Sequence, residues 1–512
     1  MDSLFLSIDT LLPLENLSLA ESGLVVQTLT AAGLIALVWK VVSFLLNRSN
    51  TKRLPPGPPG LPFIGNALQI YKDAWLIFTG WREKYGDLIY IHVANQPIII
   101  INSHEIAAEL LEKRANIYSS RPNWIAACDI MCGGLFSIFI KYNDLWRRMR
   151  RAGYETVNVQ AAAAYYPIQT KCTLDLIKDL VAEPNKWERA MKKCTGTAAI
   201  QFTYGANAPL KPTFSKFANF IARIIRAAIP GIYFVDLFPW MRHLPNIIAP
   251  WKRQAEGWYK EDNEFFEGLY NNVKENVLAG NEQPCITSTL VNQANRHNLD
   301  DHQAAWLSGT LCVAGTDTTV ASLMWFMIAM MQFPEVQEKA QKELDEVVGR
   351  DRLPTWEDRD NLVYLEALIR EVLRWRPMVP LVCLPNAWGM NHDPAVHGPD
   401  VATFNPDRHL TSDRKIIIRP ECPEGHVTFG FGKRICIGRY VAKNSLYIEI
   451  AGMLWALRLT PKRDASGKPI LPGLHESLFE GLLVRPIPFD CDIEYRFPEA
   501  ETIVNETIDR LQ

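Results

Sequence analysis

A short loop around Cys436 is the part of the sequence with the clearest capacity for chemistry. It reads FGFGKRICIG, which fits the pattern FxxGxRxCxG, and an apolar helical run follows it. A thiolate is favoured just before a helix N-terminus, because the helix dipole and the backbone N–H groups stabilise the anion. Arg434 can pair with a carboxylate of a bound group, and Phe429 can shield the sulfur. Gly432 and Gly438 permit tight or positive-φ backbone beside a flat ligand. The pattern favours a cofactor site over the alternative of a small buried cysteine.

A second candidate site lies midway along a long apolar helix, which the pattern predicts over about Asp301–Met331. The stretch reads AGTDTT, and its small residues Ala314 and Gly315 leave room for a ligand. Thr318 can bond back to a helix carbonyl and loosen the turn. Asp317 beside it supplies an acid, so the pair could deliver protons. The alternative, a polar helix face in solvent, is disfavoured because apolar residues surround the stretch.

The cysteine loop resembles the haem-thiolate signature of the cytochrome P450 family, and the resemblance extends from the proline-rich segment to about residue 490. It implies that Cys436 is the axial ligand of haem b iron, where thiolate donation favours O–O cleavage. Asp317 and Thr318 match the family's acid–alcohol pair. The fold implied is mainly α with small β-sheets, a cytochrome P450 fold with an N-terminal transmembrane helix.

The family resemblance also implies a buried ion-pair triad behind the cysteine loop. Glu371 and Arg374 form an ExxR pair on a predicted helix, and Arg408 lies in a stretch that resembles the family's second arginine motif. Such i, i+3 pairs are common on helix surfaces, so the ExxR pair alone is weak evidence. The assignment of the triad depends on the second motif, which contains Arg408. The expected role is structural and supports haem incorporation. Asp407 and His409 depart from the family pattern.

A basic helix upstream resembles the family's WxxxR helix. Trp146 and Arg150 match its haem-propionate contacts, alongside Arg434. Neighbouring arginines, Arg147 and Arg151 among them, add a positive surface. In the family this side of the haem docks an acidic flavoprotein reductase, so the expected partners are NADPH-cytochrome reductase and, as a further electron donor, cytochrome b5. The alternative is a solvated charged helix face.

The chain departs from the family between Arg374 and Pro406, where it is about twenty residues shorter than is typical. The absent segment would carry a β-hairpin and a further basic contact to a haem propionate, and no residue here matches that contact. Two alternatives to a working monooxygenase follow. One is a haem-binding but impaired or inert paralogue. The other is an O2-independent isomerase or dehydratase, against which Asp317 and Thr318 argue.

The N-terminal region predicts a membrane anchor. Residues 24–46 form an apolar stretch whose only charge is Lys40, and about 20 such residues span a bilayer. Acidic residues precede it and basic ones follow, which places the rest of the chain in the cytoplasm. A cleaved signal peptide is the weaker alternative. We expect a lumenal segment (1–23), the transmembrane helix (24–46), a basic and proline-rich hinge (47–66) and a haem-binding catalytic domain (67–512). Asn16 lies in a glycosylation sequon.

The elements expected around these sites are a β-hairpin, several helices and late strands. The hairpin spans about 88–102, and further helices cover about 334–348, 362–374 and 440–457, with short strands after residue 460. By resemblance, substrate contacts come from residues 118–140, 304–319, 379–384 and 477–482. These stretches are mainly apolar, so a hydrophobic small molecule is expected. Residues 230–251, rich in Phe, Trp and Pro, are a candidate membrane contact.

Composition excludes several other classes of protein. The 512 residues include 54 Lys and Arg against 56 Asp and Glu, a near-balance that argues against nucleic acid as the main partner. The ten cysteines form no CxxC pair, which argues against a disulfide scaffold or structural zinc site. The predicted anchor and the family resemblance, which is to fungal members, imply a single-pass endoplasmic reticulum enzyme. It would hydroxylate or epoxidise a hydrophobic substrate with O2 and electrons from NADPH, in fungal secondary-metabolite biosynthesis.

Overall fold

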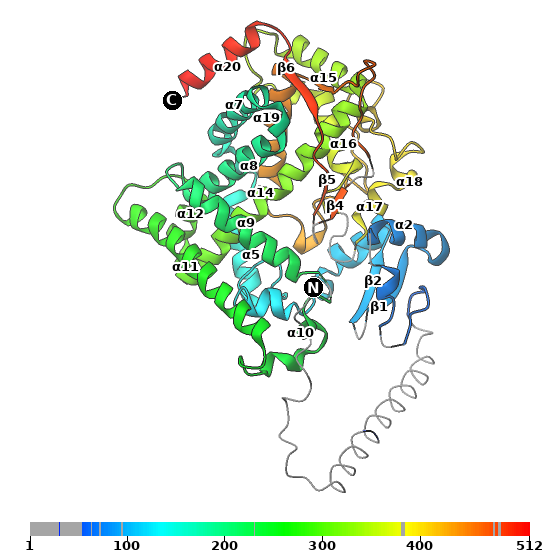
Figure 1. Ribbon diagram of the computed structural model, residues 1–512, viewed down its shortest axis with the longest axis vertical. Helices are drawn as coiled ribbons and strands as arrows, with labels where there is room; N and C mark the ends of the chain where they lie inside the picture. Colours follow the sequence, from blue (N-terminus) through cyan, green and yellow to red (C-terminus); the bar gives the residue numbers. More distant parts are fainter. Residues whose placement is uncertain are drawn as a thin grey trace.

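Helix α14 (Asp301–Gln332) runs through the middle of the molecule, and the other long helices pack around it (Figure 1). This computed structural model of the chain describes Thr30 and residues 54–62, 64–70, 73–93, 96–229, 231–379, 385–474, 477–479 and 483–511. The Asp300 side chain begins α14 by accepting a hydrogen bond from Gln303 N at 2.7 Å. The helix ends before Pro334, which lacks the N–H that would continue it.

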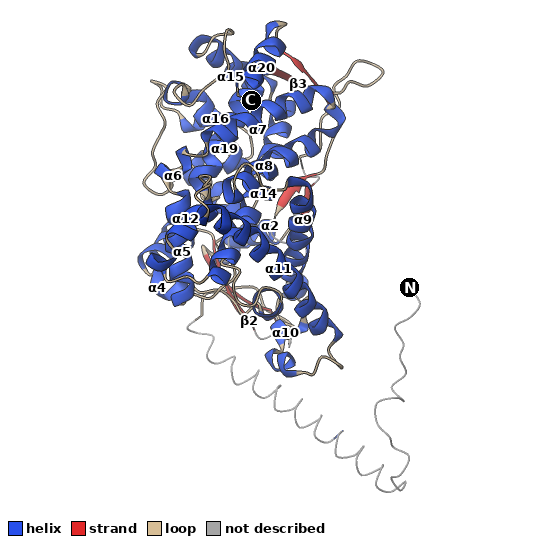
Figure 2. Cartoon of the chain, turned by 90° about the vertical axis from the view of Figure 1, so that its left-hand side faces the viewer, coloured by secondary structure: helices blue, strands red, loops and turns tan. Residues whose placement is uncertain are grey.

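The remaining helices enclose α14 on several sides, and Figure 2 shows that they make up most of the body. In chain order they are α2 (Ala74–Tyr85), α3 (His104–Ala107), α4 (Ala115–Tyr118), α5 (Asp144–Val157), α6 (Val159–Ala163), α7 (Tyr166–Ala182), α8 (Trp187–Tyr204), α9 (Leu210–Ala227), α10 (Phe234–Leu237), α11 (Pro250–Leu278), α12 (Ile286–Asn292), α13 (Ala294–His297), α15 (Pro334–Val347), α16 (Val363–Trp375), α17 (Ala387–Asn391), α18 (Pro394–His397), α19 (Arg439–Ala456) and α20 (Glu499–Arg510). A main core joins α5, α7, α8, α14, α16 and α19.

The described residues also form three two-stranded antiparallel sheets. Their strands are β1 (Leu88–Val93) with β2 (Gln96–Ile101), β3 (Leu457–Pro461) with β6 (Cys491–Tyr495), and β4 (Ser477–Phe479) with β5 (Val484–Pro486). The β1–β2 hairpin lies beside α2 and α17 at one edge of the body (Figure 1). Ile89 and Ile91 turn one face of β1 into a small core with Phe78 of α2. The sheets are therefore peripheral, and the helices carry the interior.

The structure confirms the mainly helical fold class and the main elements expected from the sequence. The predicted hairpin and the four predicted helices all form, with ends shifted by a residue or two. Helix α20 was not foreseen, although Ala500 and Val504 lie at helical spacing and are fully buried. It packs against α7 beyond the last strand. Hydrophobic periodicity therefore predicts the hairpin and the four helices. It does not predict α20, which follows a run of short strands.

The predicted membrane anchor and Asn16 lie outside the described residues, apart from Thr30. Within the described residues, α14 is the one helix long and apolar enough to cross a bilayer. However, 67% of its most apolar window is buried inside the protein. This burial fits a core helix that other helices largely cover.

Candidate functional site

The loop that carries Cys436 closes on itself before α19 begins. Cys436 N donates a hydrogen bond to Phe429 O at 2.7 Å, which holds the two ends of the motif together. Gly432 has a φ of 54°, and a Cβ at this position would lie 1.9 Å from Leu111 O, so only glycine fits. Gly438 has a φ of −86° and is the N-cap residue of α19. Apart from its chain neighbours, no described atom lies within 4 Å of where its Cβ would be. Gly438 therefore does not have the positive φ considered for it from the sequence, and it borders open space.

The thiol of Cys436 sits in an environment with opposing electrostatic effects. Its removal from bulk water raises its pKa, while the Gly438 N–H and the charges of Arg150 and Arg439 act against the rise. A bond from a backbone N–H and nearby cations favour the anion. The site therefore has the groups needed to hold a thiolate once a cation is bound to the sulfur.

Arg434 joins the cysteine loop to the segment before α5. Its guanidinium carbon lies 4.1 Å from the centre of the Trp146 ring. Arg434 Nε donates to Ser119 O at 2.8 Å, and Nη2 donates to Ile140 O at 2.7 Å. Arg434 thus contacts Trp146, which shares its predicted propionate role, and it also holds together the two ends of a long loop.

Arg150 approaches the same loop from α5. Its Nη2 donates to Ile435 O at 2.5 Å, one residue before Cys436. Burial lowers the pKa of Arg150, and the proximity of the Cys436 sulfur raises it. Helix α5 begins with an N-cap, because the Asn143 side chain accepts from Trp146 N at 2.8 Å. The structure therefore brings Trp146, Arg150 and Arg434 together around the cysteine loop.

The middle of α14 presents an accessible stretch within an otherwise buried helix. Residues 304–310 and 319–331 are buried, whereas Leu311 and residues 314–318 are partly or fully accessible. Thr318 Oγ1 donates to Ala314 O at 2.9 Å, so the predicted bond to a helix carbonyl is confirmed. Asp317 lies next to it and is partly accessible. The predicted pair is thus found where the helix opens to the interior.

The cysteine loop and α14, which carries the accessible stretch, lie close together across α5. Gly153 of α5 lies between them: a Cβ built on it would be 3.1 Å from Ile437 Cδ1 and 3.6 Å from Leu311 Cδ1. Residues 429–443 are all partly accessible, like the facing stretch of α14. A sulfur ligand on one side and small residues on the other suit a flat group held between them.

The predicted ion-pair triad is present and has a fourth member. Arg374 Nε and Nη2 each lie 2.7 Å from a Glu371 oxygen, and Arg408 Nε lies 3.0 Å from Glu371 Oε1. His409 Nε2 lies 2.9 Å from Glu371 Oε2, and Asn405 N donates to Oε1 at 2.9 Å. Glu371, Arg374 and His409 are fully buried. His409, which departs from the family's sequence pattern, is therefore part of the network.

The network keeps Glu371 ionised despite its burial. Burial opposes ionisation, but the charge of Arg374 and the hydrogen bonds from Arg374 and His409 hold the pKa of Glu371 well below its usual range. Arg374 also donates to Asn391 O at 2.8 Å, which ties α16 to α17. The arrangement is structural, because it joins α16, α17 and the turn at 405–409 behind the cysteine loop.

Comparison with known proteins decides the family. The sequence model of cytochrome P450 matches residues 55–383 and 381–490 of this chain. A cytochrome P450 monooxygenase of Armillaria gallica is 42% identical over 95% of this chain and 98% of its own length. The chain belongs to the cytochrome P450 family.

Other relatives and solved structures agree with this membership. Monooxygenase 58 of Postia placenta is 38% identical over 93% of this chain and 94% of its own length. The monooxygenase iboC of Amanita muscaria is 33% identical over 95% and 98%. A zebra fish cytochrome P450 structure with progesterone has a TM-score of 0.68 and 20% identity, covering 82% of this chain and 99% of its own. That last likeness shows the fold.

Family and fold together make this cytochrome P450 an oxidoreductase with haem b and a cysteine thiolate ligand. The residues present fit such a group. Among the described residues, no three His, Cys, Asp or Glu side chains are arranged to hold a metal ion. A single thiolate suits a metal whose other ligands come with a cofactor. Arg150 and Arg434 supply positive charge for the carboxylates, and Gly438 leaves space beside the sulfur.

The two matches of the cytochrome P450 model meet at residues 381–383, within the segment that the sequence indicates is shortened. Residues 381–384 lie outside the described part of the chain. Beyond them, Pro385 forms an isolated parallel bridge with Ile101, and Asn386 N donates to Ile101 O at 2.8 Å. The described chain therefore lies against the edge of β2 at Pro385 and Asn386.

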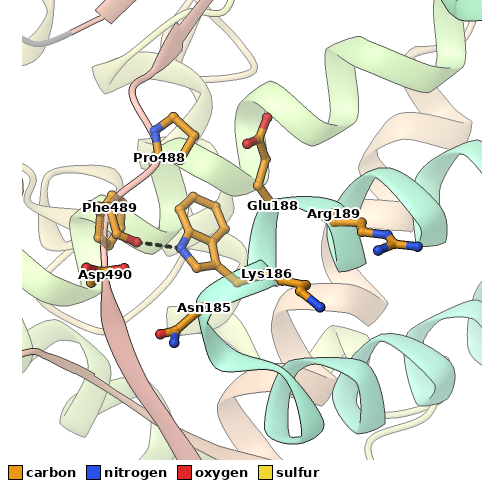
Figure 3. A pocket seen from close by; sticks show the side chains of 8 residues that line it. Asn185, Lys186, Glu188, Arg189, Pro488, Phe489 and Asp490 are labelled. Atoms are coloured by element: carbon orange, nitrogen blue, oxygen red, sulfur yellow. Dashed lines mark hydrogen bonds between the residues drawn. The ribbon is translucent and has the colours of Figure 1, made fainter.

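A surface pocket of about 290 Å³ lies where the start of α8 meets the chain before β6 (Figure 3). The Trp187 indole N–H donates to Phe489 O at 2.7 Å, while Lys186 and Arg189 point away from Phe489. None of the residues that line it belongs to the predicted site. The pocket marks a structural junction between α8 and the C-terminal strands.

Proposed function

We propose that this cytochrome P450 is a membrane-anchored monooxygenase that hydroxylates or epoxidises a hydrophobic small molecule, using O2 and electrons from NADPH through a reductase. The observation that carries the proposal is that the Cys436 loop lies close to α14 across Gly153 of α5, and that the accessible stretch of α14 carries Asp317 and Thr318. When bound, thiolate-ligated haem iron supplies the oxygen-activating chemistry. The relatives are fungal monooxygenases, and the proposal places the reaction in fungal secondary metabolism.

In this proposal each side chain has a defined task. Cys436 is the iron ligand, and Arg150, Arg434 and Trp146 hold the propionate edge. Thr318 holds a proton at its hydroxyl near the reacting centre, and Asp317 exchanges protons beside it. The back-bond of Thr318 to the α14 carbonyl keeps the hydroxyl at the surface of the helix. The Glu371 network keeps the loop's support rigid without taking part in the reaction.

The substrate pocket is expected to be apolar and aromatic. Trp124 and Phe139 have ring centres 4.3 Å apart, and Phe136 packs against Phe220 of α9 at 5.5 Å. Further stretches expected to contact substrate, 380–384 and 480–482, lie outside the described residues. Rings of this kind exclude water and bind hydrophobic molecules without directing charge at them.

Two surface features support the proposed membrane and partner contacts. Exposed apolar side chains gather on and around α10: Ile232, Phe234, Phe238, Trp240, Ile247 and Ile248. Such a patch suits a lipid bilayer, consistent with an endoplasmic reticulum location and a cytoplasmic catalytic domain. On α5, Arg147 and Arg151 are exposed. Their charge suits an acidic reductase, with cytochrome b5 as a further donor.

The test is a carbon monoxide difference spectrum of the reduced protein, followed by NADPH-dependent turnover with purified reductase. Thiolate ligation should give the long-wavelength Soret band after which the family is named. Cys436→Ala should abolish the band and all turnover, because alanine supplies no anionic sulfur. Cys491→Ala, which changes a buried cysteine of β6, is the matched control and should keep both. Oxygenation by Cys436→Ala would refute the assignment.

The shortened segment favours a second candidate, a haem-binding but impaired paralogue. The same experiment separates it from the first, because it would show the thiolate band without NADPH-dependent product. An O2-independent isomerase or dehydratase would instead form product without reductase. The Asp317–Thr318 stretch favours the monooxygenase, since the other reaction needs no proton delivery to oxygen.

A further inference from the structure

Residues 119–140 form a long loop between α4 and α5 that carries a single turn of π-helix, η5 (Ile125–Ile130). Arg434 holds both ends of the loop through Ser119 O and Ile140 O. Arg434 therefore fixes where the loop starts and stops, and leaves the position of its middle to other contacts.

The start of η5 needs a hydrogen-bond acceptor that its own sequence does not provide. The first N–H groups of a helix have no partner within it. Trp124 occupies the N-cap position, and its side chain makes no cap bond. Instead, Ala126 N donates to Asp236 Oδ1 at 3.1 Å, and the N–H of Ile125 acts on the same carboxyl group. Asp236 belongs to α10, 110 positions later in the chain.

The same arrangement begins another helix of this molecule, which supports the interpretation of Asp236 as a cap of η5. Helix α16 has Leu362 at its N-cap, without a side-chain cap bond. There Glu343 of α15 accepts from Tyr364 N at 2.8 Å and from Leu365 N at 2.9 Å. A carboxylate from a neighbouring element thus replaces a local cap in both places.

Around Asp236, a buried apolar contact joins α10 to the loop. Val235 is buried against Ile125 and Ala126, with partly buried residues at the margin. Burial raises the pKa of the Asp236 carboxyl to about 6, and the N–H groups of Ala126 and Ile125 oppose the rise. The carboxylate is therefore ionised at neutral pH and accepts hydrogen bonds at both positions. Phe234, next to Val235 in α10, is exposed at 61% of its full surface.

We propose that Asp236 is a positioning residue of the substrate pocket. It lies in the segment that carries the exposed apolar patch, and it caps η5, which is part of the pocket wall. The inference rests on the proposed function, because residues 118–140 are the expected substrate wall. Removing the cap releases η5 and shifts the adjoining Trp124, whose ring packs on Phe139. The cysteine loop and Arg434 keep their own contacts, so the wall changes while the haem side does not.

The first experiment is hydrogen–deuterium exchange of the full-length protein, read by mass spectrometry on peptides covering 124–131. In Asp236→Ala these amides should exchange roughly tenfold faster, since the cap interactions with Ala126 N and Ile125 N are lost. Asp236→Asn keeps a carbonyl acceptor and should stay close to the wild type. Asp129→Ala is the matched control, because this exposed carboxylate of η5 pairs with Arg242 at 3.6 Å and caps nothing. It should leave the exchange unchanged.

The second experiment measures ligand spectra of the haem protein. Imidazole is small and needs only access to the iron to bind. The bulky azole clotrimazole must also pack against the pocket wall formed by residues 118–140. Asp236→Ala should weaken clotrimazole roughly tenfold and leave imidazole unchanged, with Asp236→Asn restoring the affinity. Faster exchange throughout α14 as well, unchanged exchange at 124–131, or equal loss of both azoles would overturn the proposal. Absence of any imidazole spectrum in the wild type would instead refute the proposed function.

Discussion

The hydroxyl of Thr318 is the side chain whose loss should change the reaction without changing the fold. In Thr318→Ala the bond to Ala314 O disappears, and the accessible stretch of α14 loses its proton-holding group. NADPH should still be consumed, but product formed per NADPH should fall by about tenfold or more, with hydrogen peroxide released instead. The measurement is product and peroxide against NADPH oxidised.

Thr310 provides the control for this experiment on the same helix. Its Oγ1 makes the same kind of bond, to Trp306 O at 2.7 Å, in the buried part of α14. Thr310→Ala should therefore leave the product-to-NADPH ratio intact. An unchanged ratio in Thr318→Ala would remove Thr318 from proton delivery and leave it a structural residue.

At the residue scale, the sequence identified side chains that occur in compact motifs and missed those that act across the chain. Cys436, Arg434 and Thr318 are readable because each occurs in a compact sequence motif. His409 and Asp236 are not readable in this way. Each acts on a backbone or carboxylate group from another part of the chain, and hydrogen bonding at such separations is decided by packing.

Among the elements, α16 depends most on one buried carboxylate. Glu371→Gln should destabilise the protein by about 3–5 kcal/mol, because Arg374 and Arg408 then lose the charge that compensates their burial. Haem content should fall in parallel, since the network supports the cysteine loop. Urea unfolding followed by circular dichroism measures the first effect, and haem per chain after purification measures the second.

Glu366 on the same helix gives a matched comparison. It pairs with Arg370 at 3.2 Å and remains partly accessible, so Glu366→Gln should cost about 0–1 kcal/mol. If the two variants lose equal stability, the buried network contributes no more than a surface pair. The proposed structural role of Glu371 would then be abandoned.

The elements themselves show where periodicity is sufficient and where it fails. Helices α14 and α19 were predicted within a residue or two because apolar spacing and flanking Pro or Gly define them. The π-helix η5 has no such pattern, and its start is set by Asp236 of α10. The strand pair β4–β5 is three residues long on each side. Short elements of this kind owe their form to tertiary contacts, which a local sequence pattern does not contain.

For the molecule as a whole, Glu449 should impose a pH dependence on stability. It is buried in α19 with Cys194 Sγ 3.6 Å from Oε1, and burial raises its pKa to about 8. The folded state therefore keeps a proton that the unfolded state releases above its ordinary pKa of 4.5. This contribution is fully present below that value and is lost as pH rises toward 8, at roughly 1.4 kcal/mol per pH unit.

Glu449→Gln removes this titration, so the difference in stability between variant and wild type should shift in favour of the variant from pH 5 to pH 8. Urea midpoints across that range measure it. Glu357→Gln, which changes an exposed glutamate, controls for the loss of one negative charge and should show no such trend. A pH-independent difference for Glu449→Gln would mean that the carboxyl is ionised in the fold.

The shortened connection between Arg374 and Pro406 sets the last expectation for the whole molecule. The β1–β2 hairpin has no third strand among the described residues, and only the Pro385–Ile101 bridge supports its outer edge. Asn386 compensates in part, because its side chain bonds to Trp75 O at 3.1 Å and to Asn102 Oδ1 at 2.9 Å. The fold is thus closed, but the sequence offers no replacement for the absent propionate contact.

One charge-assisted hydrogen bond contributes about 1.5–3 kcal/mol, which corresponds to up to about a hundredfold in haem occupancy. Arg150 and Arg434 remain, so we expect weakened haem retention and not its loss. Haem per chain, measured after purification without added haem, should be below one.

Transfer of haem to apomyoglobin should be fast, and grafting a family-typical segment into the connection should slow it. A graft of equal length made of Gly and Ser is the control, since it restores length without a basic side chain. If the natural chain already holds one haem and resists extraction as strongly as the grafted one, Arg150, Arg434 and Trp146 suffice, and the shortened connection is compatible with full activity.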